Sequence, residues 1–394
     1  MSTIHRLASS LAPLFSRIHQ SDEAVVDDQV SIARVAAPTG AEGARAEFMA
    51  RRLRSAGLRD VTIDAAGNVL AYGGPRAASA PVVLCAHLDT VFESRNPIDV
   101  RRNGNRLHAP GISDNARGLA TLATLADLVG AGLLPVHRPV LFTATTGEEG
   151  HGDLRGSRYL FDTAAAGAHS AVALDGPGDE RVVTSALGCR RYHVAFRGPG
   201  GHSWGKYGSP NAIHAAAALV TRLTGYASYD RIRTALTVSR IAGGTTINAI
   251  PAESWLEVDV RSASDAELAR IDLHVRRATR DAAEEENARR HADSSPLSVT
   301  LTLIGERPAG EVSPDHAVVV AAAEATRAVG RAPEFAVAST DANIPISRGI
   351  PAVAIGGGGV GGDTHTPTEW FENREGSRGV VRAALLLAAL AANR

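Results

Sequence analysis

Four continuous apolar segments most constrain how this chain can fold. They cover residues 81–86, 139–144, 171–174 and 350–355, and each runs into a polar or glycine-rich stretch. Strands that are apolar at every position are typical of a parallel sheet that helices cover on both faces. Segments with a helical pattern separate these runs along the chain. We therefore predict an α/β fold in which the carboxyl ends of several strands meet at one edge of a sheet.

A second pattern lies between residues 189 and 306, where the chain predicts a smaller α+β domain. Its expected elements follow the order β-α-β-β-α-β: strands at 192–196, 235–241, 254–260 and 297–303, and helices at 210–223 and 265–290. Ser209 followed by Pro210 is a typical helix start. Because the α/β alternation resumes afterwards, the domain is inserted. Residues 1–188 and 307–394 would form the larger domain.

Imidazoles and carboxylates follow the apolar strands at the points where these strands should end. They are His87 with Asp89, Glu148 with Glu149, Asp175, and His365 after the glycine-rich run 356–362. Asp114 lies in a loop before a helix predicted at 116–130, where it could instead serve as the N-cap. Because the ends of neighbouring parallel strands share one edge, we expect these side chains to gather.

Their chemistry indicates a metal site. Histidine nitrogen and carboxylate oxygen both bind zinc, and five such ligands suit two ions that share one carboxylate. The five candidates are His87, Asp114, Glu149, Asp175 and His365. Glu148, next to a ligand, would move the proton of an attacking water. Asp89, two residues after His87, would hold the other ring nitrogen of that histidine.

Charge, hydrophobicity and cysteine content indicate which classes of partner and which cellular compartment to expect. The chain has 41 basic and 42 acidic residues, a net charge of -1, which predicts no general attraction to nucleic acid or an anionic membrane. It has no apolar stretch of the roughly 20 residues that span a bilayer. Residues 1–20 resemble a docking helix rather than a signal peptide. Cys85 and Cys189 are expected as buried thiols, as in a reducing cytoplasm.

The chain resembles the M20 family of di-zinc peptidases and amidohydrolases. The resemblance rests on five motifs in the family's order: His87-Leu88-Asp89-Thr90-Val91, Gly111-Ile112-Ser113-Asp114-Asn115, Thr146-Gly147-Glu148-Glu149-Gly150, Leu174-Asp175 and Thr364-His365-Thr366. It implies a mixed-sheet catalytic domain with helices on both faces and an inserted lid that commonly forms homodimers. Asn115 departs from the second acid that many members have at this position.

The resemblance also implies roles for individual residues. His87 and Asp175 would bind one Zn²⁺, Glu149 and His365 the other, and Asp114 would bridge them, with Mn²⁺ or Co²⁺ as possible substitutes. Glu148 would be the acid/base and Asp89 the orienting residue. In the lid, His202 of the Gly200-Gly201-His202-Ser203 motif would stabilise the oxyanion. Asn248 and Arg261 would contact the substrate.

The expected activity is hydrolysis of amide bonds in short peptides. The segments 339–343 and 349–351, with Asp rather than Glu at 175, resemble the tripeptidase T branch and favour aminopeptidase-like action. The alternative within the family is an N-acyl amino acid deacylase or a carboxypeptidase, in which Arg261 would bind the carboxylate of the product.

Three other classes compete with this interpretation. Gly201-His202-Ser203-Trp204-Gly205 fits the G-x-S-x-G elbow of serine hydrolases, with Asp259 or Asp341 and His365 completing a triad, but an elbow leads directly into a helix and here glycines and Pro210 follow. The glycines at 357, 359 and 362 fit a dinucleotide motif that lacks its βαβ unit. The third class is a protein that binds metal ions but catalyses no reaction, and such a protein would not need Glu148 as an acid or base.

Overall fold

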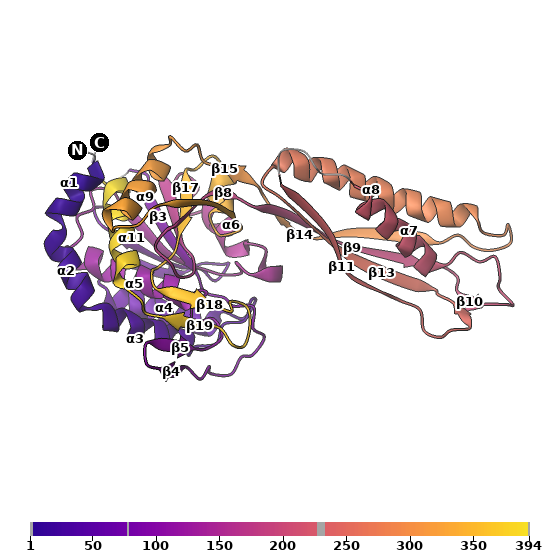
Figure 1. The fold of residues 1–394 in the computed structure, drawn as a ribbon, viewed down its shortest axis with the longest axis horizontal. Coiled ribbons are helices and arrows are strands. Elements are labelled where there is room, and N and C mark those ends of the chain that lie inside the picture. The colour runs from indigo at the N-terminus through magenta and orange to yellow at the C-terminus, as the bar shows by residue number, and fades with distance from the viewer. Residues whose placement is uncertain (1–2, 77–78, 227–232, 393–394) are drawn as a thin grey trace. The chain divides into compact units, whose positions relative to one another are not determined.

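The computed structural model describes residues 3–76, 79–226 and 233–392, so the first two residues of the predicted 1–20 helix lie outside the described residues. The chain divides into two compact units (Figure 1), one of Met1–Ala186 with Glu311–Arg394 and one of Leu187–Gly310. We predicted the borders of the inserted unit at 189 and 306. They lie slightly further out because the first and last strands of that unit, β9 (Gly188–Arg197) and β14 (Ser298–Arg307), are longer than their apolar cores.

The larger unit contains a nine-stranded mixed sheet. Its order is β1-β2-β6-β3-β7-β17-β8-β15, with β16 paired to β8. The strands are β1 (Arg59–Ile63), β2 (Val69–Gly73), β3 (Val82–His87), β6 (Val140–Thr145), β7 (Ser170–Leu174), β8 (Arg181–Ala186), β15 (Gly310–Glu311), β16 (Glu334–Ala338) and β17 (Ala352–Ile355). The four central strands β6, β3, β7 and β17 run parallel, whereas β1, β2 and β8 pair in antiparallel fashion within this order. This confirms the predicted mixed α/β fold.

Helices cover both faces of this sheet because side chains of the central strands alternate between two cores. On β3, Val82, Leu84 and Ala86 join one core, and Val83 and Cys85 join the other. The first core is shared with α1 (Thr3–Ser10), α2 (Ala12–Gln20), α3 (Asp22–Ala33), α4 (Gly43–Ser55), α5 (Ala116–Gly130), α9 (Ala317–Ala328) and α11 (Ser377–Leu390). The second is shared with α6 (Arg155–Asp162) and α10 (Asn343–Ser347). Helix α1 packs beside α11 (Figure 1).

A small antiparallel sheet in the same unit was not predicted from the sequence. It consists of β18 (Val360–Gly362), β19 (Trp370–Glu372), β5 (Arg106–His108) and β4 (Arg101–Asn103), in that order. Trp370 pairs with His108 and Glu372 with Arg106. The sheet therefore joins the segment before the Asp114 loop to the segments on either side of His365.

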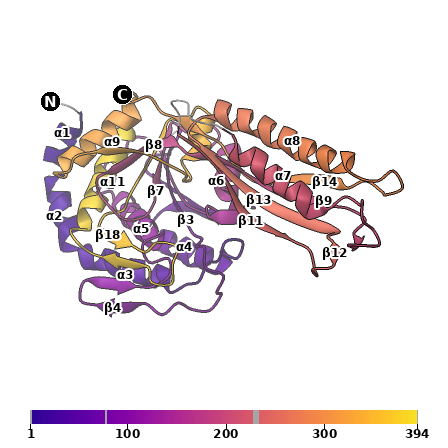
Figure 2. The same ribbon diagram turned by 45° about the vertical axis from the view of Figure 1, so that its right-hand side comes forward.

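The inserted unit has the predicted β-α-β-β-α-β order. Its antiparallel sheet runs β11-β13-β9-β14, with β11 at Thr234–Gly243 and β13 at Glu253–Ser262. Helices α7 (Ala212–Thr224) and α8 (Asp265–Ala288) lie side by side on one face (Figure 2). Alternate residues of β13 (Leu256, Val258 and Val260) pack against them. Two short strands, β10 (Gly201–His202) and β12 (Ala249–Ile250), form a separate ladder.

Two helix starts differ from the sequence prediction. Helix α7 begins at Ala212 rather than Pro210, because the side chain of Asn211 accepts hydrogen bonds from the amides of residues 213 and 214 and so forms the N-cap. Helix α5 is capped by Asn115, whose side chain accepts from the Gly118 amide, so Asp114 is not the cap. Within the described residues, no helix has the length and apolar character needed to cross a membrane.

Candidate metal centre

The parallel strands deliver polar residues to one edge of the large sheet. His87 is the last residue of β3, Asp175 follows β7 directly, and Glu148 and Glu149 lie on the turn after β6. All four central strands are buried at every position, so their ends are fixed by packing on both faces. Because the parallel strands end at the same edge of the sheet, the polar residues at their ends are brought to that edge.

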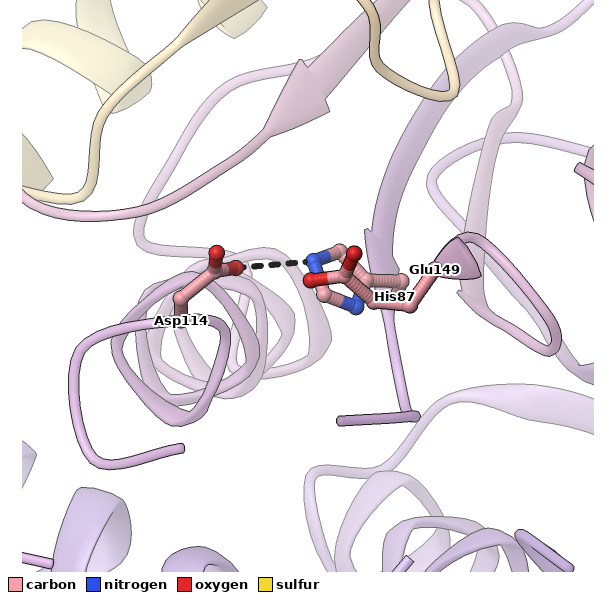
Figure 3. Close-up of side chains that lie close together, drawn as sticks. All are labelled: His87, Asp114 and Glu149. Atoms are coloured by element: carbon pink, nitrogen blue, oxygen red, sulfur yellow. Dashed lines mark hydrogen bonds and ion pairs between the residues drawn. The ribbon is translucent and has the colours of Figure 1, made fainter. Parts of the chain in front are cut away.

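His87, Asp114 and Glu149 form the centre of the site (Figure 3). One ligand atom from each lies within 4.8 Å of the others. The His87 Nε2 atom is 3.0 Å from Asp114 Oδ1. The second carboxylate oxygen of Asp114, Oδ2, is 3.2 Å from His365 Nε2, which in turn lies 2.8 Å from Glu149 Oε1. The two oxygens of Asp114 thus face two different imidazoles.

The charges in this cluster act strongly on one another. Burial lowers the pKa of His87, but the carboxylates of Asp114 and Asp89 outweigh burial and raise it well above its usual value. The carboxylates of Asp114 and Glu149 raise the pKa of His365 to about 10. Burial, together with the charge of Asp114, raises the pKa of Asp175 to about 7. The cluster has more negative charge than its buried position favours, and a divalent cation bound by these nitrogen and oxygen atoms would neutralise it. The residues therefore fit a metal.

Asp89 contacts more of the site than the single histidine that we predicted. Its carboxylate is fully buried and accepts hydrogen bonds from the amides of Glu148, at 2.9 Å, and Glu149, at 3.0 Å, and from the hydroxyl of Thr39, at 2.8 Å. The Nδ1 atom of His87 lies 3.0 Å from the Asp89 backbone carbonyl and 3.7 Å from its carboxylate. Asp89 therefore contacts both His87 and the turn that carries the two glutamates.

The turn after β6 is held by Glu42, which the sequence analysis missed. Glu42 is buried, and its Oε1 atom accepts from the amide of Gly147, at 3.0 Å, while Oε2 pairs with Arg155, at 2.7 Å. Gly147 has φ +62°, a conformation that favours glycine, and a Cβ there would lie 2.2 Å from Nη1 and 2.7 Å from Cγ of Arg155 and would displace that side chain. The one signal in the sequence is an acid beside glycine in a loop, at Gly40 to Gly43.

Asn115 links the Asp114 loop to the end of β7. Besides capping α5, it donates to the carbonyl of Leu174 and accepts from the amide of Gly176. The Asp114–Asn115 peptide bond is cis. Asn115 was singled out because it departs from the family motif. Its amide donates one hydrogen bond and accepts two, and a carboxylate could only accept them.

The three candidate residues of the inserted unit are described within that unit. His202 is exposed on β10, and its Nδ1 atom accepts from the amides of Trp204 and Gly205, at 3.2 and 3.4 Å. Asn248 is exposed and accepts from the hydroxyl of Thr246. The Arg261 side chain is 46% exposed, and its Nε atom donates to Asp259 at 2.7 Å.

The competing motifs do not acquire the context that they need. Ser203 follows the two-residue strand β10, and α7 begins only at Ala212, so the segment is not a strand–turn–helix elbow. Asp259 pairs with Arg191 and Arg261. The glycine-rich run leads into β18 rather than into a helix, so it is not a dinucleotide fingerprint.

Comparison with known proteins agrees with the motifs. Residues 83–392 match the family model described as peptidase family M20/M25/M40. A protein of Mycobacterium tuberculosis named as a succinyl-diaminopimelate desuccinylase is 28% identical over 218 residues, 53% of this chain and 60% of that protein. A protein of Emericella nidulans named as a carboxypeptidase is 25% identical over 305 residues, 66% of this chain and 69% of that protein.

Solved structures show the same fold. An aminopeptidase of Bacillus cereus has a TM-score of 0.77 at 20% identity and covers 94% of this chain and 99% of its own. A tripeptidase of Staphylococcus aureus has a TM-score of 0.78 at 20% identity and covers 93% and 98%. Together with the family match over residues 83–392, this identifies the chain as a member of peptidase family M20/M25/M40.

Proposed function

We propose that the protein is a metal-dependent hydrolase that cleaves amide bonds of short peptides. The observation that carries the proposal is the position of Asp114, whose two oxygens face His87 on one side and His365 on the other. A carboxylate that shares its oxygens in this way suits a bridge between two metal ions. Membership of a peptidase family supports the reaction class.

In this proposal two zinc ions are held by the five predicted ligands. His87 and Asp175 would hold one, Glu149 and His365 the other, and Asp114 would bridge them; Mn²⁺ or Co²⁺ could take the same ligands. When bound, such ions polarise a carbonyl group and lower the pKa of a water. Asp89 would keep His87 and the Glu148–Glu149 turn in place through the contacts described above.

Glu148 is the proposed acid and base. The residue is only 4% exposed, and its backbone amide donates a hydrogen bond to Asp89. A carboxylate at this position takes a proton from the attacking water and returns it to the leaving nitrogen. Because the group lies beside the ligand Glu149 on the same turn, one local structure would set both roles.

His202 is the proposed donor to the oxyanion. Because its Nδ1 atom accepts from two backbone amides, the hydrogen of the neutral ring lies on Nε2, which is then free to donate. We assign substrate contacts to Asn248 and Arg261 on the basis of the family motifs. Arg261 would bind a substrate carboxylate through its guanidinium.

A second candidate function is removal of an N-acyl group from an amino acid, or carboxypeptidase action. It is favoured by the names of two sequence relatives, a desuccinylase and a carboxypeptidase, whereas two of the structural relatives are named as an aminopeptidase and a tripeptidase. Both candidates use the same metal site. They differ in whether the substrate presents a free amino group or a free carboxylate near the cleaved bond.

We also propose that the protein works in the cytoplasm as a homodimer formed through the inserted unit. Strand β11 lies at the edge of its sheet, and its second half, from Ser239 to Gly243, is exposed. An exposed edge strand of ten residues is a natural pairing surface for another chain. Light scattering during size-exclusion chromatography tests this proposal, and a monomer at micromolar concentration would refute it.

The test of the proposed function combines metal analysis with a substrate panel. The purified protein is analysed for bound metal and then assayed on tripeptides, dipeptides and N-acetyl amino acids, with and without a chelator. We expect two metal ions per chain and tripeptide cleavage that the chelator abolishes. Preference for N-acetyl amino acids would instead favour the second candidate. Activity that survives chelation and stops with a serine-directed reagent would refute both.

A further inference from the structure

Glu369 is a buried carboxylate that the proposed chemistry does not use. It follows His365 by four residues and directly precedes β19, and its side chain has no exposed surface. Moving a carboxylate out of water is unfavourable unless hydrogen bonds replace the water. The hydrogen bonds to this carboxylate therefore indicate its role.

All four hydrogen bonds to the Glu369 side chain come from the loop that carries Asp114. Its Oε2 atom accepts from the amide of Gly111, at 2.9 Å. Its Oε1 atom accepts from the amide of Ser113, at 2.8 Å, the hydroxyl of Ser113, at 2.6 Å, and the amide of Asp114, at 3.0 Å. A carboxylate has about four acceptor positions. Oε1 accepts three of these hydrogen bonds and Oε2 one, so the carboxylate is directed at the backbone of the Asp114 loop, and Glu369 is not part of the cluster of His87, Asp114 and Glu149.

The backbone of Glu369 is tied to both sides of the site. Its amide donates to the carbonyl of Thr366, the residue after His365, and its carbonyl accepts from the amide of Ala109. One residue thus connects the loop that carries His365 to the loop that carries Asp114. These two ligands come from segments about 250 residues apart in sequence, and neither lies on a helix or strand.

We propose that Glu369 is a positioning residue that fixes the Asp114 loop against the His365 loop and thereby sets the affinity of the site for metal. The inference rests on the proposed function, because it concerns the same ligands. Removing a residue that orients metal ligands through hydrogen bonds, without contacting the metal itself, typically lowers metal affinity by about 10–100-fold. A residue that served only the fold would change stability without changing this affinity.

The chemistry of the side chain predicts a graded series. Glu369→Gln keeps the shape, but its one carbonyl oxygen can serve only one of the two groups of donors. With that oxygen toward Ser113 and Asp114, three hydrogen bonds remain and the new amide group meets the Gly111 amide. Glu369→Ala loses all four. The matched control is Glu372→Ala on the following strand, β19, since Glu372 pairs with Arg106 and Arg374 rather than, among the described residues, with the Asp114 loop.

The experiment measures Zn²⁺ stoichiometry and affinity by competition with a chromophoric chelator, together with thermal unfolding of the metal-free proteins. We expect Glu369→Gln to unfold close to the wild-type temperature and to bind Zn²⁺ about tenfold more weakly, Glu369→Ala to bind more weakly still, and Glu372→Ala to bind as the wild type does.

Wild-type affinity in both Glu369 variants would overturn the inference, as would a lower unfolding temperature with unchanged affinity. If Glu369→Ala fails to fold, Glu369→Gln decides alone. A wild-type protein that binds no Zn²⁺ would overturn the proposed function and this inference together. Two bound ions with unaffected variants would overturn only this inference.

Discussion

Replacing Glu42 by alanine should weaken the turn that carries Glu148 and Glu149. The change leaves the buried amide of Gly147 without an acceptor, which costs about 1–3 kcal/mol. The Arg155 side chain is 37% exposed, so water replaces much of its ion pair, and that loss adds at most about 1 kcal/mol. We therefore expect the free energy of unfolding to fall by about 1–4 kcal/mol.

Calorimetry of the metal-free protein measures this loss, because bound metal would add its own stabilisation. A fall of this size lowers the unfolding temperature by several degrees. The turnover number should fall as well, since both glutamates lie on the loosened turn. Glu47→Ala is the control, because Glu47 is an exposed acid on the nearby helix α4. A Glu42→Ala protein that unfolds at the wild-type temperature and keeps its turnover number would refute the reasoning.

Four further predictions concern single residues. Glu148→Ala should abolish turnover while elemental analysis still finds two metal ions, and measurable turnover would remove the assigned base. His202→Ala should lower kcat by about 10²-fold, as loss of an oxyanion donor does, and an unchanged kcat would exclude that role. Arg261→Ala should mainly raise KM in steady-state assays for substrates with a free carboxylate, and equal KM values for amidated substrates would count against it. Burial raises the pKa of Asp272, but hydrogen bonds from Arg276 and from the hydroxyl of Tyr192 outweigh burial and lower this pKa in the folded protein. The resulting stability is present above the unfolded pKa and lost as the pH falls, so acid titration should destabilise wild type more than Asp272→Asn; parallel curves would contradict this.

Three of the proposed ligands could be placed from the sequence because they end or follow buried strands. A strand that is buried at every position, such as β6, lies in the middle of a covered sheet, and the first polar residues after it lie at the edge where the strand ends. His87, Glu149 and Asp175 were found in this way.

The supporting residues could not be predicted in this way. Glu42 accepts from an amide 105 residues further along the chain, and Glu369 from an amide 258 residues before it. Hydrogen bonds to backbone amides carry no residue-type signal, since any residue but proline donates one. The strands of the small sheet are three residues long, too short to show an alternating pattern, and Asn211 displaced the predicted Ser209–Pro210 helix start.

The position of β17 in the sheet has a consequence for the order of synthesis. Strand β17 lies between β7 and β8, so these two strands, consecutive in the chain, do not pair with each other. During synthesis on the ribosome, the sheet lacks the strand between β7 and β8 until residues 352–355 emerge. This happens after the whole inserted unit has been made. Domains fold as units while the chain is synthesised. The inserted unit can therefore fold first, and the larger unit gains the proposed ligand His365 only after β17 has been made.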